Sequence, residues 1–137
     1  MTRILILCTG NSCRSQMAEG FLKEMLPYGE IYSAGTKPAE AVNPNSIRVM
    51  MEAGIDISSQ KPEHVDLYKG LDFDYVITVC DNAREICPVF IGDVKNRLHI
   101  GFPDPWEATG TESEVIQVYR DVRDMIAKEF AALVVRL

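Results

Sequence analysis

The sequence lacks any apolar stretch long enough to cross a membrane, because a spanning helix needs about 20 consecutive apolar residues. It also lacks an excess of basic residues. The 14 lysines and arginines stand against 20 aspartates and glutamates, and the net charge is −6. This charge argues against a surface adapted to nucleic acid or to an anionic membrane. The N-terminus, with one arginine and a very short apolar run, is not a secretory signal peptide. We therefore expect a cytoplasmic protein.

Histidine and cysteine are both scarce. The two histidines show no spacing typical of metal ligands, and the four cysteines are Cys8, Cys13, Cys80 and Cys87. Their C-x4-C and C-x6-C spacings do not match common structural zinc sites. In the reducing cytoplasm, disulfides are mostly transient and catalytic. The cysteine content therefore indicates thiol chemistry more than a metal site.

Alternating apolar segments predict one α/β domain over residues 1–137. Strands are expected at about Arg3–Leu7, Glu30–Ala34, Asp74–Val79 and Arg97–Ile100. Helices are expected at about Ser15–Leu26, from Asn43-Pro44 to about Ala53, and after a Thr111–Glu114 capping box. The last helix should turn these side chains inward: Val115, Val118, Tyr119, Val122, Met125, Ile126 and Phe130. The pattern predicts a four-stranded parallel sheet with helices on both faces.

The most informative segment follows the first predicted strand and reads C-x5-R-S, from Cys8 to Ser15. Loop N–H groups and a helix N-terminus there supply positive potential, and Arg14 can hold two oxygens of a tetrahedral anion. The same field should lower the pKa of Cys8 and make it a thiolate nucleophile. The alternative is a small buried thiol on an ordinary turn. The expected anion-binding residues are Thr9, Gly10, Asn11, Ser12, Cys13, Arg14 and Ser15.

Two further features should lie at the same sheet edge, because ligands bind beyond the carboxyl ends of parallel strands. Cys80 follows the third predicted strand, and Asp104 comes soon after the fourth. Pro105 biases the backbone of Asp104 to the extended region. The Asp104 carboxyl could donate a proton to an oxygen that leaves the bound anion. The alternative is a turn residue, because Asp-Pro is common in loops.

The segment from Cys80 to Cys87 reads as a short helix between two thiols. If it were fully helical, the two Cα atoms would lie roughly 10 Å apart along the axis. A disulfide needs Cα atoms within about 7 Å, so these cysteines can pair only if the segment unwinds. The alternative is a pair of small buried side chains. The role of Cys13 is open as well, because its side chain could pair with Cys8 under oxidation or serve as structural packing.

With these motifs, the chain resembles the thioredoxin-coupled arsenate reductases, which are built on the low molecular weight tyrosine phosphatase fold. The resemblance covers most of the chain. It rests on Cys8–Ser15 extended through Gln16-Met17-Ala18-Glu19-Gly20, on Cys80…Cys87-Pro88, and on Asp104-Pro105 followed by Ala108-Thr109-Gly110. The anion loop alone is shared with the phosphatases. The extension and the second cysteine pair are more specific for the reductases.

The resemblance implies a role for each of these residues. Cys8 attacks arsenate held by the loop, the Ser15 hydroxyl stabilises the Cys8 thiolate, and Asp104 protonates the departing oxygen. Cys80 then attacks the sulfur of Cys8, and arsenite leaves with the bonding electrons. Cys87 attacks Cys80, and thioredoxin reduces the resulting disulfide. We expect a monomer whose partners are arsenate and thioredoxin.

Potassium is the one candidate cofactor, since some members of this family bind it near the anion loop. Asn11, Glu19 and Ser33 match part of that site, but the remaining acidic ligand, expected within residues 63–66, is not assigned. Trp106 departs from the family pattern, where a small residue is expected. An aromatic residue there is reminiscent of the phosphatases and keeps an aryl-phosphatase side activity open. The alternative is a partly exposed packing residue.

Two rival functions remain. A tyrosine phosphatase would share the anion loop and the acid, but would not require Cys80 or Cys87. A non-enzymatic oxyanion-binding thiol redox sensor would use the same cysteines, and Asp104-Pro105 counts against it because a sensor needs no general acid.

Overall fold

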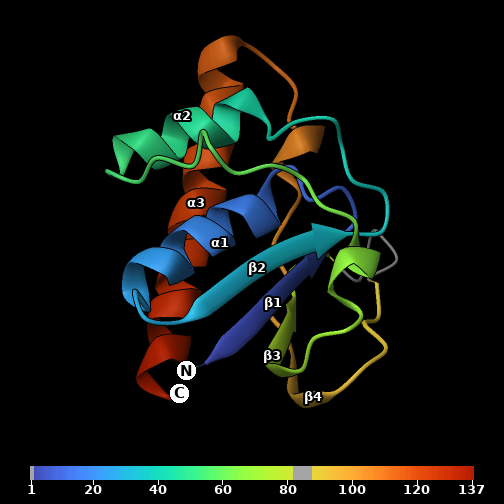
Figure 1. Ribbon diagram of the computed structural model, residues 1–137. Helices are drawn as coiled ribbons and strands as arrows, with labels where there is room; N and C mark the ends of the chain where they lie inside the picture. Colours follow the sequence, from blue (N-terminus) through green and yellow to red (C-terminus); the bar gives the residue numbers. More distant parts are fainter. Residues whose placement is uncertain (1, 82–87) are drawn as a thin grey trace.

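The computed structural model describes residues 2–81 and 88–137 and contains a four-stranded parallel sheet in the order β2-β1-β3-β4 (Figure 1). The strands are β1 (Arg3–Cys8), β2 (Glu30–Gly35), β3 (Phe73–Thr78) and β4 (Val94–His99). The predicted α/β fold class is confirmed. The first three strands begin and end within one residue of their expected bounds, whereas β4 begins three residues earlier than expected.

The two faces of the sheet are covered differently. Three helices, α1 (Arg14–Met25), α2 (Pro44–Glu52) and α3 (Glu112–Val135), contribute to one core that includes Ile4 and Ile6 of β1. On the other face, Leu5 and Leu7 pack with Phe90 and with side chains of the 3₁₀ helix η1 (Val65–Tyr68). Helices therefore lie on both faces, long on one and short on the other (Figure 1). None of the helices in the described ranges combines the length and the apolar character that crossing a membrane requires.

The predicted helix ends are present. The Asn43 side chain accepts a hydrogen bond from the Asn45 N–H at 2.8 Å and caps α2, which stops short of Gly54, a glycine with φ of 82°. At the start of α3, Thr111 and Glu114 form both hydrogen bonds of the capping box. Local polar side chains therefore decide where these helices begin, as the sequence indicated.

The inward face of α3 differs in part from the prediction. Its buried residues are Ile116, Tyr119, Val122, Ile126, Phe130 and Leu133. The prediction was wrong for Val118 and Met125, which are 37% and 46% exposed. It also missed Ile116 and Leu133. Because α3 is an outer helix that is covered on one side only, apolar residues at the edge of its stripe stay at the surface.

Strand order brings two predicted site segments together. β1 lies between β2 and β3, and the Val79 N–H donates to the Leu7 carbonyl at 3.0 Å, which extends the pairing of β1 with β3 beyond Thr78. Cys8, at the end of β1, and Cys80, just after β3, therefore lie at the same edge of the sheet, on neighbouring strands. The chain turns to opposite sides of β1 here, and such a topological switch point is where parallel sheets bind ligands.

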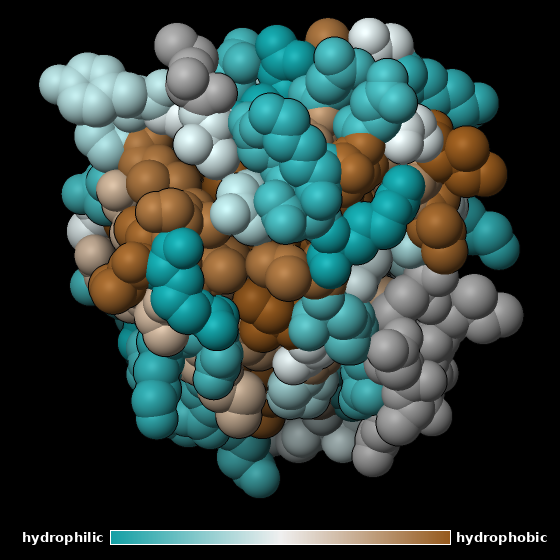
Figure 2. Space-filling view, turned by 90° about the horizontal axis from the view of Figure 1, so that it is seen from below, coloured by the Kyte–Doolittle hydropathy of each residue, from teal (hydrophilic) through white to brown (hydrophobic). Residues whose placement is uncertain are grey.

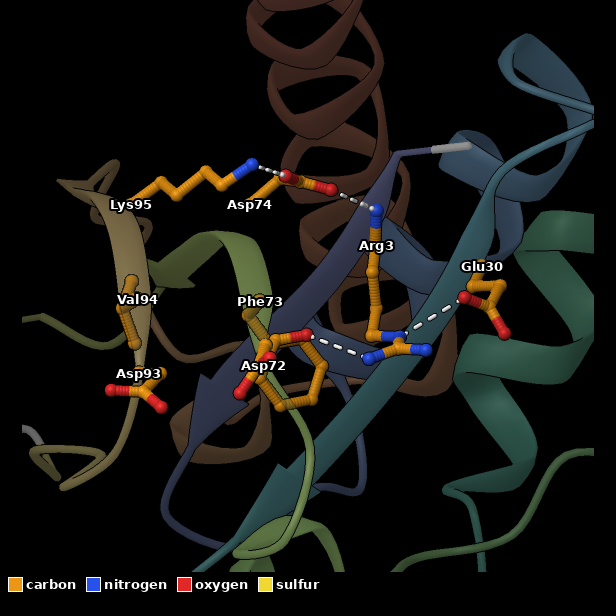
Figure 3. Close-up of a pocket in the computed structure, with 8 residues that line it drawn as sticks. All are labelled: Arg3, Glu30, Asp72, Phe73, Asp74, Asp93, Val94 and Lys95. Carbon is orange, nitrogen blue, oxygen red and sulfur yellow. Dashed lines mark hydrogen bonds and ion pairs between the residues drawn. The ribbon is translucent and has the colours of Figure 1, made fainter.

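Charged residues fasten the opposite end of the sheet (Figure 3). Arg3 of β1 donates through Nε to Glu30 of β2 at 3.0 Å, and through its backbone N–H to Asp74 of β3 at 2.8 Å. Lys95 of β4 lies 3.3 Å from the other oxygen of Asp74. The Arg3 N–H and Lys95 lower the pKa of Asp74. Viewed from below, the molecule shows apolar side chains over the left and centre of this face and a smaller group at the right, among hydrophilic side chains (Figure 2).

The end of β2 passes directly against the segment after Cys8. A Cβ placed on Gly35 would lie only 2.2 Å from the carbonyl oxygen of Thr9, a contact with backbone that cannot be relieved by a rotamer change. Gly35→Ala should therefore displace the predicted anion loop. We expect it to lower the free energy of unfolding by roughly 1–3 kcal/mol, and to weaken phosphate binding in titration calorimetry.

Gly70→Ala is the matched control, because no heavy atom lies within 4 Å of its added Cβ. It should change the free energy of unfolding by less than about 0.5 kcal/mol. Equal effects of the two substitutions on stability and on phosphate binding would contradict the assigned contact.

Candidate active site

The loop after β1 turns its carbonyl groups outward. The carbonyl oxygens of Thr9, Gly10 and Ser12 accept hydrogen bonds of 2.9–3.1 Å from backbone N–H groups of Lys37, Ala39 and Asn43. Segment 37–43 thus holds the loop from outside. With its carbonyls directed away, the loop leaves its N–H groups to the inner side, which is the arrangement of a backbone anion nest.

Helix α1 adds its positive end to this loop. Cys13 is the N-cap residue and makes no side-chain capping bond, and the Met17 N–H makes the first intrahelical bond, to the Cys13 carbonyl. The N–H groups of the first turn are therefore left for a ligand, where the helix dipole also favours negative charge. The predicted position of the anion-binding motif, between strand and helix, is confirmed.

Asn11 locks the shape of the loop. It is fully buried and has a φ of 49°, in the left-handed region that asparagine tolerates better than most residues. Its Nδ2 donates to the hydroxyl oxygens of Ser15 at 2.8 Å and Ser33 at 2.9 Å, and its Oδ1 accepts from the Glu63 N–H at 2.9 Å. Because Ser15 accepts from Asn11, its own hydroxyl hydrogen remains to be donated to another group.

Arg14 and Asp104 are placed as a pair. The Arg14 side chain is 3% exposed, donates through Nη1 to the Phe102 carbonyl at 3.0 Å, and carries Nη2 3.6 Å from Asp104 Oδ2. Asp104 caps the 3₁₀ helix η2 (Pro105–Glu107), where its Oδ1 accepts from the Trp106 N–H at 3.0 Å. A short helix therefore fixes the carboxyl group that the Asp-Pro pair suggested.

One cavity joins these groups. It has a volume of about 520 Å³ and is lined by Cys8 and the loop as far as Arg14, by Asp104 and Trp106, and by segment 39–44. Within this lining, Thr9 Oγ1 is buried and has no hydrogen-bond partner among the described residues. The sequence predicted that Cys8, Arg14 and Asp104 meet, and they do. The cavity is large enough for a small organic ligand.

Cys13 also lines this cavity, whereas Cys80 is not among its lining residues. Cys80 is fully buried and belongs to the same buried cluster as Cys8 and Cys13. It is disulfide-bonded, whereas Cys8 and Cys13 are thiols. Burial raises the pKa of Cys13, whose sulfur lies 4.0 Å from the Tyr119 hydroxyl, so this thiol stays protonated. Cys87, and the short helix predicted around it, lie outside the described residues.

The predicted potassium ligands already have hydrogen-bond partners in this structure. Glu19 Oε1 accepts from the Ser33 hydroxyl at 2.5 Å, and Glu19 Oε2 accepts from the Lys23 ammonium at 2.6 Å. Asn11 Oδ1 already accepts from the Glu63 N–H. Lys23 therefore supplies the positive charge that a bound cation would bring.

Sequence reasoning missed the residues that support the site from outside. Segment 37–43 acts through its backbone, which leaves no signal in the pattern of side chains. Gln16, by contrast, is fully buried and donates to the carbonyls of Asn11 and Lys61, at 3.0 and 3.1 Å. The sequence did carry a signal for Gln16, because it is a polar residue in the first turn of a helix whose inward face is otherwise apolar.

Comparisons with known proteins agree with this geometry. The model of the low molecular weight phosphotyrosine protein phosphatase family matches residues 3–137. An arsenate reductase of Halalkalibacterium halodurans is 48% identical over 126 residues, which cover 91% of this chain and 89% of that protein. Among solved structures, an arsenate reductase in its oxidised state is 28% identical with a TM-score of 0.81, over 99% of this chain and 98% of that one.

A thioredoxin-dependent arsenate reductase of Corynebacterium glutamicum shares the fold, with a TM-score of 0.64 and 22% identity, over 100% of this chain and 64% of its own. The family model and the curated relative both extend over nearly the whole sequence. The chain therefore belongs to the low molecular weight phosphotyrosine protein phosphatase family, and its curated relatives within that family include arsenate reductases.

Proposed function

We propose that this protein reduces arsenate to arsenite through a relay of cysteine thiols. The observation that carries the proposal is the cavity in which Cys8, a loop of inward N–H groups, Arg14 and Asp104 meet, with Cys80 at the end of the neighbouring strand. The 48% identity to a curated arsenate reductase supports it. A phosphatase would need the cavity but would have no use for Cys80 at the end of the neighbouring strand.

The first step is attack of the Cys8 thiolate on arsenic. The loop N–H groups and the Arg14 guanidinium hold the oxygens of the tetrahedral anion. A bond forms between Cys8 Sγ and arsenic, and one oxygen departs as water with a proton from Asp104. Ser15, whose hydroxyl oxygen accepts from Asn11, keeps a hydrogen with which to stabilise the thiolate.

The second step is attack of Cys80 on the sulfur of Cys8. An S–S bond forms, the S–As bond breaks, and its electron pair goes to arsenic, so As(V) becomes As(III) and arsenite departs. Cys87 then attacks Cys80, which releases Cys8 and leaves a Cys80–Cys87 disulfide. The disulfide-bonded state of Cys80 and its place in one cluster with Cys8 support this sequence.

The reductant that completes the cycle is a thioredoxin. A dithiol protein reduces the relay disulfide by exchange, and the Corynebacterium glutamicum relative is thioredoxin-dependent. The reducing cytoplasm is where such a cycle can run, and we expect the protein to act there as a monomer.

Two assays on purified protein distinguish the candidate functions. One contains arsenate, thioredoxin, thioredoxin reductase and NADPH, and the other contains p-nitrophenyl phosphate. A phosphorus adduct on Cys8 would hydrolyse, so aryl-phosphatase activity is the second candidate, and the exposed Trp106 beside the cavity favours it. NADPH oxidation that requires arsenate supports the reductase. Activity in neither assay would leave the redox sensor.

Cys8→Ser should abolish both arsenate reduction and phosphatase activity, because the weakly acidic hydroxyl is not a nucleophile at neutral pH. Arg14→Lys should lose most of the activity, since an ammonium cannot make the bidentate contact. Both variants are measured in the two steady-state assays above. Substantial turnover by Cys8→Ser would end this assignment.

Asp104→Asn tests the general acid. It should slow formation of the Cys8–arsenic adduct by roughly 10²–10⁴-fold. Arsenate binding should survive, because the amide can still accept the Trp106 N–H that holds this side chain. Single-turnover kinetics and calorimetric binding separate the two effects. An unchanged first step would reassign Asp104 to a purely structural turn.

The two substitutions Cys80→Ser and Cys87→Ser should block different steps of the proposed relay. Cys80→Ser should stop arsenite release and leave the phosphatase activity, since hydrolysis needs no second thiol. Cys87→Ser should complete one turnover and stall as a Cys8–Cys80 disulfide. Peptide mapping after turnover identifies the trapped bond. A Cys87→Ser protein that turns over repeatedly, or wild type with both thiols reduced after turnover without reductant, would exclude this order of events.

A further inference from the structure

The cavity at Cys8 has room for more than its proposed substrate. Its volume is about 520 Å³, whereas a tetrahedral anion of five heavy atoms occupies roughly 100 Å³ or less, about three water volumes. A small phosphate monoester can therefore place its phosphoryl group in the anion loop and its substituent in the remaining space. The loop N–H groups bind both anions in the same way, so selection against organic phosphates has to come from the rest of the cavity wall.

Charged side chains are few on this wall, and most of them are acidic. Among the described residues that line the cavity, Arg14 is the basic one, and Glu40 and Asp104 are the acidic ones. Arg14 Nη2 lies 3.6 Å from Asp104 Oδ2, so these two charges offset each other. Lys37, on the same segment as Glu40, is not among the lining residues. Glu40 therefore leaves a net negative charge on the wall of a cavity that receives anions.

Hydrogen bonds to the anion loop hold Glu40 in place from both sides. The Ala39 N–H donates to the Gly10 carbonyl at 2.9 Å, and the Ala41 carbonyl accepts from the Ser12 hydroxyl at 3.3 Å. The Glu40 backbone lies between these two bonds, and its exposed side chain borders the cavity. The carboxylate is therefore kept at the entrance, beside the space that a substituent on the bound anion would occupy.

We propose that Glu40 is a specificity-determining residue, which keeps the cavity from binding organic phosphates whose substituents carry further negative charge. Nucleotides and phosphorylated carboxylic acids belong to this class. Inorganic arsenate has no substituent that extends toward this carboxylate. The inference rests on the anion-binding part of the proposed function and does not depend on the cysteine relay.

The size of the effect follows from the charges that share the cavity. A negative substituent near Glu40 weakens binding by roughly 3–10-fold, because two like charges repel across a short, partly hydrated distance. A positive substituent is attracted by a similar factor. Dissolved salt screens charges at an exposed entrance, so the discrimination should decrease as the ionic strength rises. Specificity of this kind comes from repulsion of the wrong ligand and requires no new contact with the right one.

The test compares two phosphonates of similar size, phosphonoacetate with a carboxylate substituent and 2-aminoethylphosphonate with an ammonium substituent. Titration calorimetry at low salt measures the Kd of each for the reduced protein, and neither ligand can accept electrons from the thiols. Wild type should bind 2-aminoethylphosphonate more tightly. Glu40→Gln, which keeps the size of the side chain and removes its charge, should reduce the ratio of the two Kd values by roughly 10-fold, since both the repulsion and the attraction are lost.

Glu24→Gln is the matched control. Glu24 is exposed and does not line the cavity, and this substitution changes the net charge of the protein by the same amount. The ratio of the two Kd values should stay within about 2-fold of wild type, because a distant exposed charge is screened. The comparison of variants with the same two ligands also cancels differences between the ligands themselves, such as their own phosphonate pKa values.

The outcomes separate this inference from the proposed function. A ratio that is unchanged in Glu40→Gln, or that changes equally in Glu24→Gln, would overturn the inference and leave the proposed function. Failure of inorganic phosphate to bind the reduced wild type would overturn both, because both need the anion loop. The expected ratios in a wild-type protein that does not reduce arsenate would support the role of Glu40 and overturn the proposed function.

Discussion

The direction of a few backbone carbonyl groups governs the chemistry of this protein. A loop can present its N–H groups to an anion only if its carbonyl oxygens have partners elsewhere, since buried backbone groups must be satisfied. Segment 37–43 supplies those partners, and the missing side chain of Gly35 lets β2 pass close enough to complete the support. Asn11 then holds the inner side in a left-handed turn. The anion cradle is thus built by main chain from two distant segments.

Strand order then brings a second cysteine segment close to this loop. Cys8 and Cys80 are 72 positions apart in sequence, yet the bond from the Val79 N–H to the Leu7 carbonyl places them at the ends of adjacent strands. Asp104 arrives from the next strand along the sheet. A parallel sheet collects all its carboxyl ends at one edge, so three functions share one site without any long excursion of the chain.

Much of this could be predicted because its determinants are local. The C-x5-R-S motif, the Asn43-Pro44 and Thr111–Glu114 caps and the apolar strands each carry their signal within a few residues. The supports of the site could not be predicted, because backbone hydrogen bonds from segment 37–43 depend on chain path and not on side-chain type. The potassium expectation stays a prediction, and it too overlooked a neighbouring residue. Asn11, Glu19 and Ser33 match the pattern, but Lys23, one helical turn from Glu19, already balances the charge.

At the amino end of the sheet, charged contacts link all four strands, through Arg3, Glu30, Asp74 and Lys95. These contacts also affect the opposite edge. Sliding one strand by a single residue would turn its core side chains toward the opposite face and would separate these charges. These charged contacts therefore help to keep the four strands in register. Local opening at the carboxyl edge, where the proposed thiol relay would operate, can proceed while the strands keep their alignment, so the edge closes again in the same pairing.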